Sequence, residues 1–308
     1  MPYPNTFRIV LCEVVPLSEL QQLFPHYLHE CFGGQRSQLV SMDGKTMRGT
    51  ILKYEQQGVP LLVVYLPEKG IVLAQIAVDS KENEVCASPR SISHPNLRHR
   101  IMCGEALLTQ RELSAVVLAQ RGAYIWFLKD NHPTMRGGVE QLSKATLKAA
   151  GWRAPTLESR TATSMTKGHG RLQGRLLARI ADETGFLDWF DLRPLFQLRR
   201  LVLDEQTGEV ITEDVRHGII RLVLGHCTAS QLVGLIQSYW GIQDGLHHRR
   251  DVTLQDDGAY ISQHGPAEAI AAPKNFVIGL LRKQGFTNLV SVRRCFDTEI
   301  ASYLALFV

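Results

Sequence analysis

The sequence predicts an α/β fold in which a mixed β-sheet is flanked by helices. Three β-rich runs follow one another with turns between them, at 39–43, 59–66 and 70–78, a pattern typical of an antiparallel meander. Beyond them, apolar segments at 98–103 and 124–128 enclose a helical pattern, which favours parallel strands joined by a helix. We therefore expect the order β-β-β-α-β-α through this part of the chain.

Helical spacing of apolar residues identifies the remaining elements. The polar run 79–84 is of the kind that caps a following helix, and Pro16 divides the first helical segment. The segments with helical patterns are 6–31, 109–120, 135–150, 228–239 and 274–282.

A β-rich insert is expected in the second half of the chain, after the polar, glycine-containing stretch that begins at residue 134. The strands predicted from alternating apolar residues are 171–182, 195–204 and 208–221. We place the insert at about 134–225, inside a domain that spans 38–308 and follows an N-terminal helical segment, 1–37.

The composition is that of an ordinary globular protein: 308 residues, 44% hydrophobic and 21% charged, with ample length for a core. A net charge of +4 is compatible with a nucleic-acid partner. The six scattered cysteines contain no C-x-x-C pair, so we expect reduced thiols and neither a disulfide frame nor a zinc site. Since membrane-span and signal patterns are absent from the sequence, a cytoplasmic location is expected.

A single carboxylate, Asp43, follows the first β-rich run. Gly44 and the basic residues Lys45 and Arg48 come directly after it. This order predicts a strand that carries Asp43 at its exit, where a turn frees the carboxylate from the core. The alternative is a surface turn in which Asp43 only accepts hydrogen bonds from turn amides. The residues by themselves leave both interpretations open.

Further blocks along the chain carry a family resemblance. In order, the blocks read DGKTMRG (43–49), GEALLTQ (104–110), KDNHPT (129–134), WGIQDGLH (240–247) and RDVT (250–253). Each block alone is a weak signal, but the combination in this order is highly specific and runs from about residue 5 to the C-terminus. The chain resembles the H-repeat-associated (ISAs-type) branch of the insertion-sequence DDE transposases. The resemblance implies a ribonuclease H-like fold, which agrees with the element order above.

The resemblance also implies an acidic triad that binds two divalent metal ions, Mg²⁺ or Mn²⁺. Phosphodiester transfer needs one metal to activate a nucleophile and another to stabilise the leaving oxygen. Carried over by position, the triad and metal ligands are Asp43, Glu105 and Gln243, where the family has Asp, Asp and Glu. Glu105 keeps the charge but adds a methylene. Gln243 offers only a neutral carbonyl oxygen, so the second metal should bind more weakly.

Two nearby acids could compensate for Gln243. Asp244 is its neighbour but points about 100° round the helix, and Asp251 lies two turns on and closer to the correct face. The alternatives of an active and an inactive copy therefore both remain.

Basic and polar residues in the same blocks are candidates for phosphate contacts, against the alternative of solvated turns and helix faces. They are Lys45, Arg48, Lys129, Asn131, His132, His247, Arg249 and Arg250. The partners implied by the resemblance are double-stranded DNA, namely transposon terminal inverted repeats and target DNA, and a further copy of the chain on that DNA. The resemblance also implies a bacterial cytoplasmic location, at the nucleoid when bound to DNA.

The first functional interpretation is a DDE transposase that binds transposon ends and catalyses metal-dependent cleavage and strand transfer. The second is a catalytically inactive, decayed or repurposed DNA-binding protein on the same fold. A third, an unrelated metal-dependent nuclease, is disfavoured by the downstream blocks. Because family members carry additional helical sequence ahead of the segment that begins here near Pro4, the resemblance implies a truncated copy, with 1–37 as a remnant.

Overall fold

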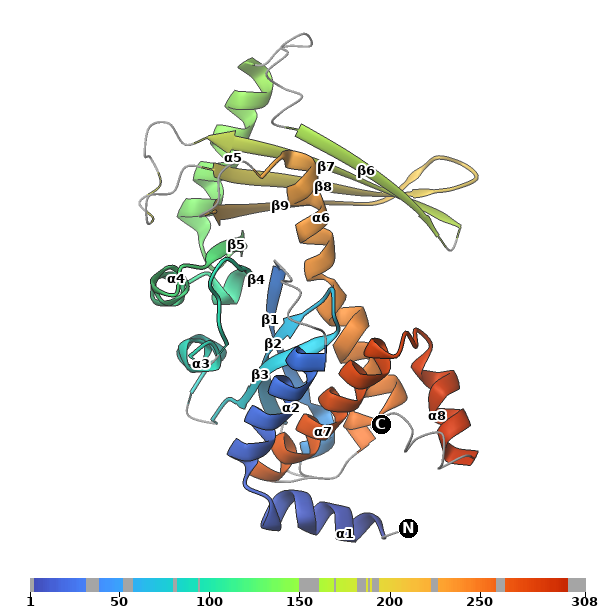
Figure 1. The fold of residues 1–308 in the computed structure, drawn as a ribbon. Coiled ribbons are helices and arrows are strands. Elements are labelled where there is room, and N and C mark those ends of the chain that lie inside the picture. Colours follow the sequence, from blue (N-terminus) through green and yellow to red (C-terminus); the bar gives the residue numbers. More distant parts are fainter. Residues whose placement is uncertain are drawn as a thin grey trace. The chain divides into compact units, whose positions relative to one another are not determined.

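The computed structural model describes residues 3–31, 39–51, 58–79, 82–93, 95–149, 161–168, 170–181, 187, 189, 194–222, 227–258 and 264–298. The chain divides into two compact units (Figure 1). Unit 1 consists of Met1–Asn96 and Ser238–Val308, and unit 2 of Leu97–Gln237. Unit 2 therefore contains the predicted insert, and the division into 1–37 and 38–308 stays a prediction.

Unit 1 contains the predicted antiparallel meander. Its strands are β1 (Leu39–Met47), β2 (Val59–Leu66) and β3 (Ile71–Ala77), with β2 paired to both neighbours. Gly70 closes the β2–β3 turn at a φ of 73°, in the left-handed region that favours glycine. The meander is confirmed.

The prediction that β1 ends at Asp43 is wrong. The strand continues to Met47, and Asp43 and Lys45 pair with Val63 and Leu61 of β2. The polar residues stay in the ladder because the apolar strand β2 continues opposite them and supplies backbone partners. A strand end inferred from side-chain polarity alone misses this pairing.

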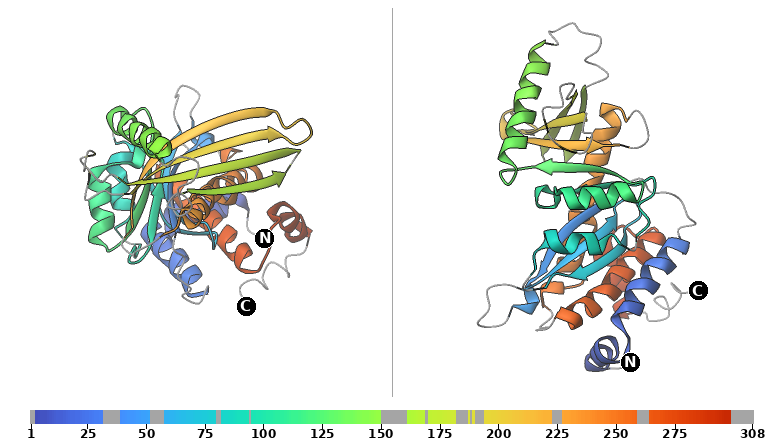
Figure 2. Two further views of the ribbon diagram at one scale, coloured as in Figure 1. Left: turned by 90° about the horizontal axis from the view of Figure 1, so that it is seen from above. Right: turned by 90° about the vertical axis from the view of Figure 1, so that its left-hand side faces the viewer.

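Helices cover the unit 1 sheet (Figures 1 and 2). Among them, α2 and α7 pack against each other and against β3. The rings of Phe24 and Phe276 stack with centroids 4.6 Å apart. The helix α7 begins ten residues before the predicted 274–282, and α8 was not predicted. The unit 1 helices are α1 (Pro4–Ile9), α2 (Leu17–Cys31), α3 (Glu84–Ser91), α7 (His264–Lys283) and α8 (Leu289–Thr298).

Shorter helical turns complete unit 1. The π-helical turns are η1 (Val10–Val14), η4 (Gln243–His247) and η5 (Arg249–Thr253), and the 3₁₀ turns are η2 (Arg48–Thr50) and η6 (Asp256–Gly258). Thus the helical pattern predicted to run on beyond residue 239 is present, but with π-helical geometry.

Unit 2 contains a mixed sheet of parallel and antiparallel strands. Its order is β4-β5-β9-β8-β7-β6, with β4 and β5 parallel and all other pairs antiparallel. The strands are β4 (Ile101–Gly104), β5 (Ala123–Leu128), β6 (Thr161–Gly168), β7 (Arg171–Ala181), β8 (Pro194–Asp204) and β9 (Val210–Arg221). The strands predicted at 171–182, 195–204 and 208–221 are confirmed as β7, β8 and β9, and β6 is an addition that the sequence pattern did not predict.

Helices accompany this sheet as the α/β prediction requires. The 3₁₀ turn η3 (Ala106–Leu108) and the helix α4 (Arg111–Ala119) connect β4 to β5. The helix α5 (Pro133–Ala149) packs on β7, β8 and β9. The helix α6 spans Ala229–Tyr239. Of the described helices, none is long and apolar enough to cross a membrane. The five cysteines that the structure describes fully, Cys12, Cys86, Cys103, Cys227 and Cys295, are free thiols.

Candidate active site

In unit 1, one face of β1 meets one face of the π-helical segment 243–253. Asp43 and Lys45 share a face of the strand because alternate residues do. Gln243, His247 and Asp251 recur at intervals of four residues. Gln243 Nε2 donates to Asp43 Oδ2 at 2.6 Å, His247 Nε2 lies 3.3 Å from the same oxygen, and Lys45 Nζ pairs with Asp251. Successive residues on this face of the strand therefore contact successive turns of the helical segment.

The Asp43 carboxylate is held in place from several sides. Its side chain is 14% exposed. Oδ1 accepts a hydrogen bond from the Gly44 amide at 3.0 Å, while Oδ2 faces Gln243 and His247. The structure thus brings together two of the three residues that the resemblance implies for the triad, from positions 200 residues apart.

In this arrangement the Asp251 carboxylate pairs with the Lys45 ammonium. It therefore serves as the counter-charge of a buried lysine rather than as a substitute for the acid missing at 243. Asp244, on the other side of the helical segment, is exposed.

A second carboxylate, Glu84, lies against Gly44 of the same strand, and sequence reasoning missed it. Glu84 is the first residue of α3, whose N-cap Asn83 accepts from the Cys86 amide at 2.9 Å. A Cβ added to Gly44 would lie 2.1 Å from Glu84 Oε1, so the carboxylate packs directly over the glycine. Burial and the neighbouring Asp43 charge raise the pKa of Glu84. The polar run 79–84 signalled a helix cap, but no spacing rule ties it to residue 43.

In unit 2, Glu105 follows β4 and has cationic neighbours. Lys129 Nζ lies 2.5 Å from its Oε2, and Arg216 Nη1 lies 3.7 Å from its Oε1. Lys129 follows β5, and the carboxyl ends of two parallel strands meet at one edge of a sheet. Asp43 and Gln243 belong to unit 1 and Glu105 to unit 2, so the arrangement of all three stays a prediction.

Two of the predicted phosphate contacts are buried. Lys45 is 8% exposed and is paired with Asp251. Arg250 is 0% exposed, and its Nε donates to Asp256 at 2.7 Å. Both cations already have counter-charges inside unit 1, so neither is the solvated residue of the alternative interpretation, and their contact with phosphate stays a prediction. Sequence spacing missed the burial because the counter-charges come from other elements.

The other candidates differ in exposure. Arg48 and Lys129 are exposed, and Arg249 is partly so. Asn131 Nδ2 donates to the carbonyl oxygen of Ala106 at 2.8 Å, which fixes the loop after β5. His132 is half-buried, and His247 is buried against Asp43.

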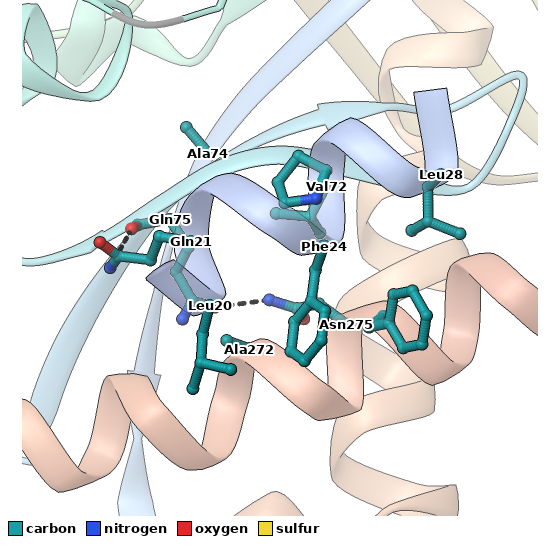
Figure 3. Close-up of a pocket in the computed structure, with 11 residues that line it drawn as sticks. Leu20, Gln21, Phe24, Leu28, Val72, Ala74, Gln75, Ala272 and Asn275 are labelled. Atoms are coloured by element: carbon teal, nitrogen blue, oxygen red, sulfur yellow. Dashed lines mark hydrogen bonds between the residues drawn. The ribbon is translucent and has the colours of Figure 1, made fainter. Parts of the chain in front are cut away.

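A cavity lies between α2, β3 and α7 (Figure 3). Its lining is mostly apolar, with Leu20 and Phe24 on α2. Gln75 forms its polar edge (Figure 3). The backbone carbonyl oxygen of Gln75 accepts a hydrogen bond from Gln21 Nε2 at 3.1 Å, and its side-chain Oε1 accepts one from Asn275 Nδ2 at 2.8 Å. The cavity has no carboxylate among its lining residues, which makes it unsuited to metal-assisted phosphoryl transfer.

Comparison with known proteins identifies relatives over most of the chain. The "H repeat-associated putative transposase YhhI" of Escherichia coli K12 is 22% identical over 280 residues, covering 89% of this chain and 71% of its own length. The "Putative transposase YncI" of Escherichia coli O157:H7 is 22% identical over 289 residues, covering 92% of this chain and 71% of its own length. No family model matches.

Two further comparisons give a shorter sequence match and a distant solved structure. The "H repeat-associated putative transposase YbfD" of Escherichia coli K12 is 24% identical over 177 residues, 57% of this chain and 67% of its own length. A cryo-EM structure of the piggyBac transposase synaptic complex with hairpin DNA aligns with a TM-score of 0.37 and 7% identity, over 95% of this chain and 63% of that one. That similarity is too weak to support an argument about the fold.

Two relatives that match most of this chain, YhhI and YncI, are thus named as putative transposases. Within that class, the chain is a relative of the H repeat-associated transposases, as its sequence blocks predicted.

Proposed function

We propose that this chain is an insertion-sequence transposase of the DDE type, with a ribonuclease H-like fold, that binds the DNA at transposon ends. The observation that carries the proposal is the contact between Asp43 Oδ2 and Gln243 Nε2 at 2.6 Å. Two blocks 200 residues apart in the sequence supply the partners, at the positions that the family resemblance assigns to catalysis. The transposase relatives, which match 89% and 92% of the chain, support the same class.

The residues fit a divalent metal ion in part. Mg²⁺ and Mn²⁺ prefer hard oxygen ligands, which Asp43, Glu105 and the Gln243 carbonyl supply. Within the described ranges, no three His, Cys, Asp or Glu side chains converge as metal ligands. When bound, such an ion would stabilise charge on a transferring phosphoryl group. The protein's own contribution is to hold the Asp43 carboxylate with Gln243 and His247.

Gln243 weakens the proposed catalysis because of the way its amide group is oriented toward Asp43. Its amide N–H donates to Asp43, so the amide nitrogen faces the carboxylate, whereas a metal ion would need the oxygen. A glutamate at this position could not make the same hydrogen bond and would be repelled by Asp43 unless a cation lay between them.

The proposed DNA contacts are Arg48, Lys129 and Arg249, because these cations retain exposure, with Asn131, His132 and His247 as neighbouring polar groups. Lys45 and Arg250 are left out of this set. Phosphates of transposon-end and target duplexes are the proposed partners, with a second copy of the chain on the DNA. The proposed location is the bacterial cytoplasm.

A second candidate function is DNA binding without catalysis. Two observations favour it: the third acid position is Gln243, and the Glu105 carboxylate lies against Lys129 and Arg216. Both reduce the negative charge available to metal ions.

The experiment that tests the proposal compares the unaltered chain with the double variant Glu105→Asp/Gln243→Glu. Fluorescence anisotropy measures binding to duplexes taken from the DNA that flanks the coding sequence, against scrambled duplexes. Gel assays then measure nicking and strand transfer with Mg²⁺ or Mn²⁺. We expect preferential end binding by both proteins and higher turnover by the double variant. Equal binding to scrambled DNA would refute the transposase assignment, while end binding without gained turnover would favour the non-catalytic alternative.

A further inference from the structure

Two arginines on the β-rich sheet of unit 2 lie directly opposite each other, on the neighbouring strands β7 and β8. We propose that Arg175 and Arg200 form a phosphate-binding site on this sheet, which takes a backbone phosphate of duplex DNA. The site lies within unit 2, and neither residue belongs to the sequence blocks that carry the family resemblance. The choice of DNA as the source of the phosphate rests on the proposed function, whereas anion binding by the two arginines does not.

The first argument is the register of the sheet. Arg175 in β7 pairs with Arg200 in β8, and Arg200 pairs in turn with Asp214 in β9. Directly opposite residues of antiparallel strands point to the same face, with Cα atoms about 4.5–5.5 Å apart. The two guanidinium groups therefore share one face of the sheet. Like charges in this position destabilise strand pairing, so formation of the sheet does not explain the pair.

The second argument is uncompensated positive charge. Asp214, the acid opposite Arg200, accepts a hydrogen bond from Arg216 Nε at 2.7 Å. Asp204, further along β8, accepts hydrogen bonds from two backbone amides of its own turn, at 2.8 Å and 2.9 Å. In the part of the chain that the structure describes, neither Arg175 nor Arg200 forms an ion pair. The acids on this face are thus engaged elsewhere, and the two arginines are left with each other.

The third argument is that neutral groups hold the Arg175 guanidinium in position. Its Nη1 donates to Thr166 Oγ1 at 3.2 Å, and its Nη2 donates to Gln173 Oε1 at 2.9 Å. The Nε atoms of Arg175 and Arg200 are buried and have no hydrogen-bond partner within the described structure. Burial, together with the Arg200 charge, lowers the pKa of Arg175. An anion bound between the two side chains would therefore supply the missing counter-charge.

The two faces of the sheet differ in character beside the arginine pair. On the arginine face, the neighbouring row of the ladder adds the hydroxyl and amide groups of Thr166, Gln173 and Thr212. The opposite face exposes apolar side chains there, including Met165 at 66% and Leu176 at 39%. Because arginine, hydroxyl and amide side chains are the groups that contact DNA phosphates, the arginine face is the one suited to DNA.

A phosphodiester group matches the arginine pair in charge and in geometry. The guanidinium group is planar, permanently charged and presents paired N–H donors that fit phosphate oxygens. Since a phosphodiester has two unbridged oxygens, one group can accept hydrogen bonds from both arginines. Contacts of this kind carry no sequence information, so the pair should contribute to DNA affinity and its salt dependence, but not to the preference for transposon ends.

The test measures the affinity of the full chain for the flanking-DNA duplexes by fluorescence anisotropy, over a series of salt concentrations in EDTA. We expect Arg175→Gln and Arg200→Gln each to weaken binding about tenfold at low salt, equally for end and scrambled duplexes. The slope of log affinity against log salt concentration should become shallower by about 1. The matched control is Arg199→Gln, which removes one positive charge from the adjacent position of β8. Arg199 lies on the opposite face and pairs with Glu213, so affinity should stay within about twofold.

Thermal unfolding separates loss of a binding group from loss of the fold. Because Arg200→Gln removes a like-charge repulsion, its unfolding temperature should be equal to or above that of the unaltered chain. If Arg200→Gln does not fold, Arg200→Lys replaces it. This variant keeps the charge but loses the planar paired donors, so it too should bind DNA more weakly than the unaltered chain. DNA affinity and salt slope that are the same in the Arg175 and Arg200 variants as in Arg199→Gln overturn the proposal.

Two further outcomes separate the source of the phosphate and the function on which the proposal rests. Calorimetric titration with inorganic phosphate that detects binding at Arg175 and Arg200, while DNA affinity ignores both residues, assigns the site to a free anion and overturns the choice of DNA. Preferential end binding that ignores both arginines refutes the site and leaves the transposase assignment standing. Binding that depends on the arginines, but is equal for end and scrambled duplexes, supports the site and refutes that assignment.

Discussion

Asp43 in unit 1 and Glu105 in unit 2 are both carboxylates that the sequence marked as metal ligands, yet their neighbours differ. Asp43 faces an amide, Gln243, and an imidazole, His247. Glu105 faces Lys129 and Arg216. Charge at Asp43 is therefore left for an added cation to neutralise, while charge at Glu105 is neutralised by the protein. Two carboxylates predicted as ligands of one site can thus have opposite electrostatic surroundings.

The difference extends to the other acids of unit 1, several of which are buried. Asp256 is 0% exposed between Arg250 and Lys274, and Glu268 is 9% exposed. We therefore expect substitutions of these buried unit 1 carboxylates to change stability strongly and those around Glu105 to change it little.

The largest expected effect is that of Asp256→Ala. It leaves the fully buried Arg250 guanidinium without its counter-charge, and removing one partner of a buried pair typically costs about 3–5 kcal/mol. Urea unfolding should show a free energy of unfolding lower by that amount. The control Asp244→Ala removes an exposed carboxylate from the same segment and should stay within about 0.5 kcal/mol. Equal effects of the two variants would contradict the structural role of this pair.

The next effect depends on pH. Burial raises the pKa of Glu268 from 4.5 to about 7, with Arg90 opposing the shift. Because the folded pKa lies above the unfolded one, the stability that Glu268 contributes is present below pH 4.5 and is lost as the pH rises through 7. Glu268→Gln keeps an acceptor for the Ala77 amide and cannot ionise.

Between pH 5 and pH 8, we therefore expect the free energy of unfolding to change by about 2–3 kcal/mol less in Glu268→Gln than in the unaltered chain. Chemical denaturation measures this difference. Glu112→Gln, at an exposed position of α4, serves as the control and should not alter the pH profile. A profile unchanged by Glu268→Gln would show that this carboxyl does not titrate in the stated range.

A smaller effect is expected from Gln243→Glu, which tests the charge imbalance at Asp43 directly. In EDTA, loss of the hydrogen bond to Asp43 and repulsion between the carboxylates should lower the free energy of unfolding by about 1–2 kcal/mol. Added Mn²⁺ should restore it, because a bound cation offsets the repulsion. Gln284→Glu, exposed beyond α7, should respond to neither condition. Failure of Mn²⁺ to stabilise Gln243→Glu would remove the contrast between the two carboxylates.

The smallest effect is expected from Lys129→Gln. Its side chain is 57% exposed, and exposed ion pairs contribute about 0–1 kcal/mol, so thermal unfolding should change little. Binding to DNA should nevertheless weaken, with a shallower dependence on salt concentration, if Lys129 contacts phosphate. An unchanged salt dependence would assign Lys129 to Glu105 alone.

The sequence by itself determined most of the elements and their order. The meander, the parallel pair at 101–104 and 123–128, and the β-rich insert all follow from local periodicity and turn residues, because these depend on neighbours in the chain. The ordered blocks also placed the chain among relatives of the H repeat-associated transposases, and assigned Asp43 and Gln243 to one site.

Only the tertiary structure decided which charges meet. The extension of β1 beyond Asp43 depends on β2, and the burial of Lys45 and Arg250 depends on Asp251 and Asp256. Glu84 packs against β1 because α3 begins beside Gly44, which leaves space for its carboxylate. Side-chain polarity alone cannot distinguish an exposed cation from a buried pair, since burial is set by segments distant in sequence.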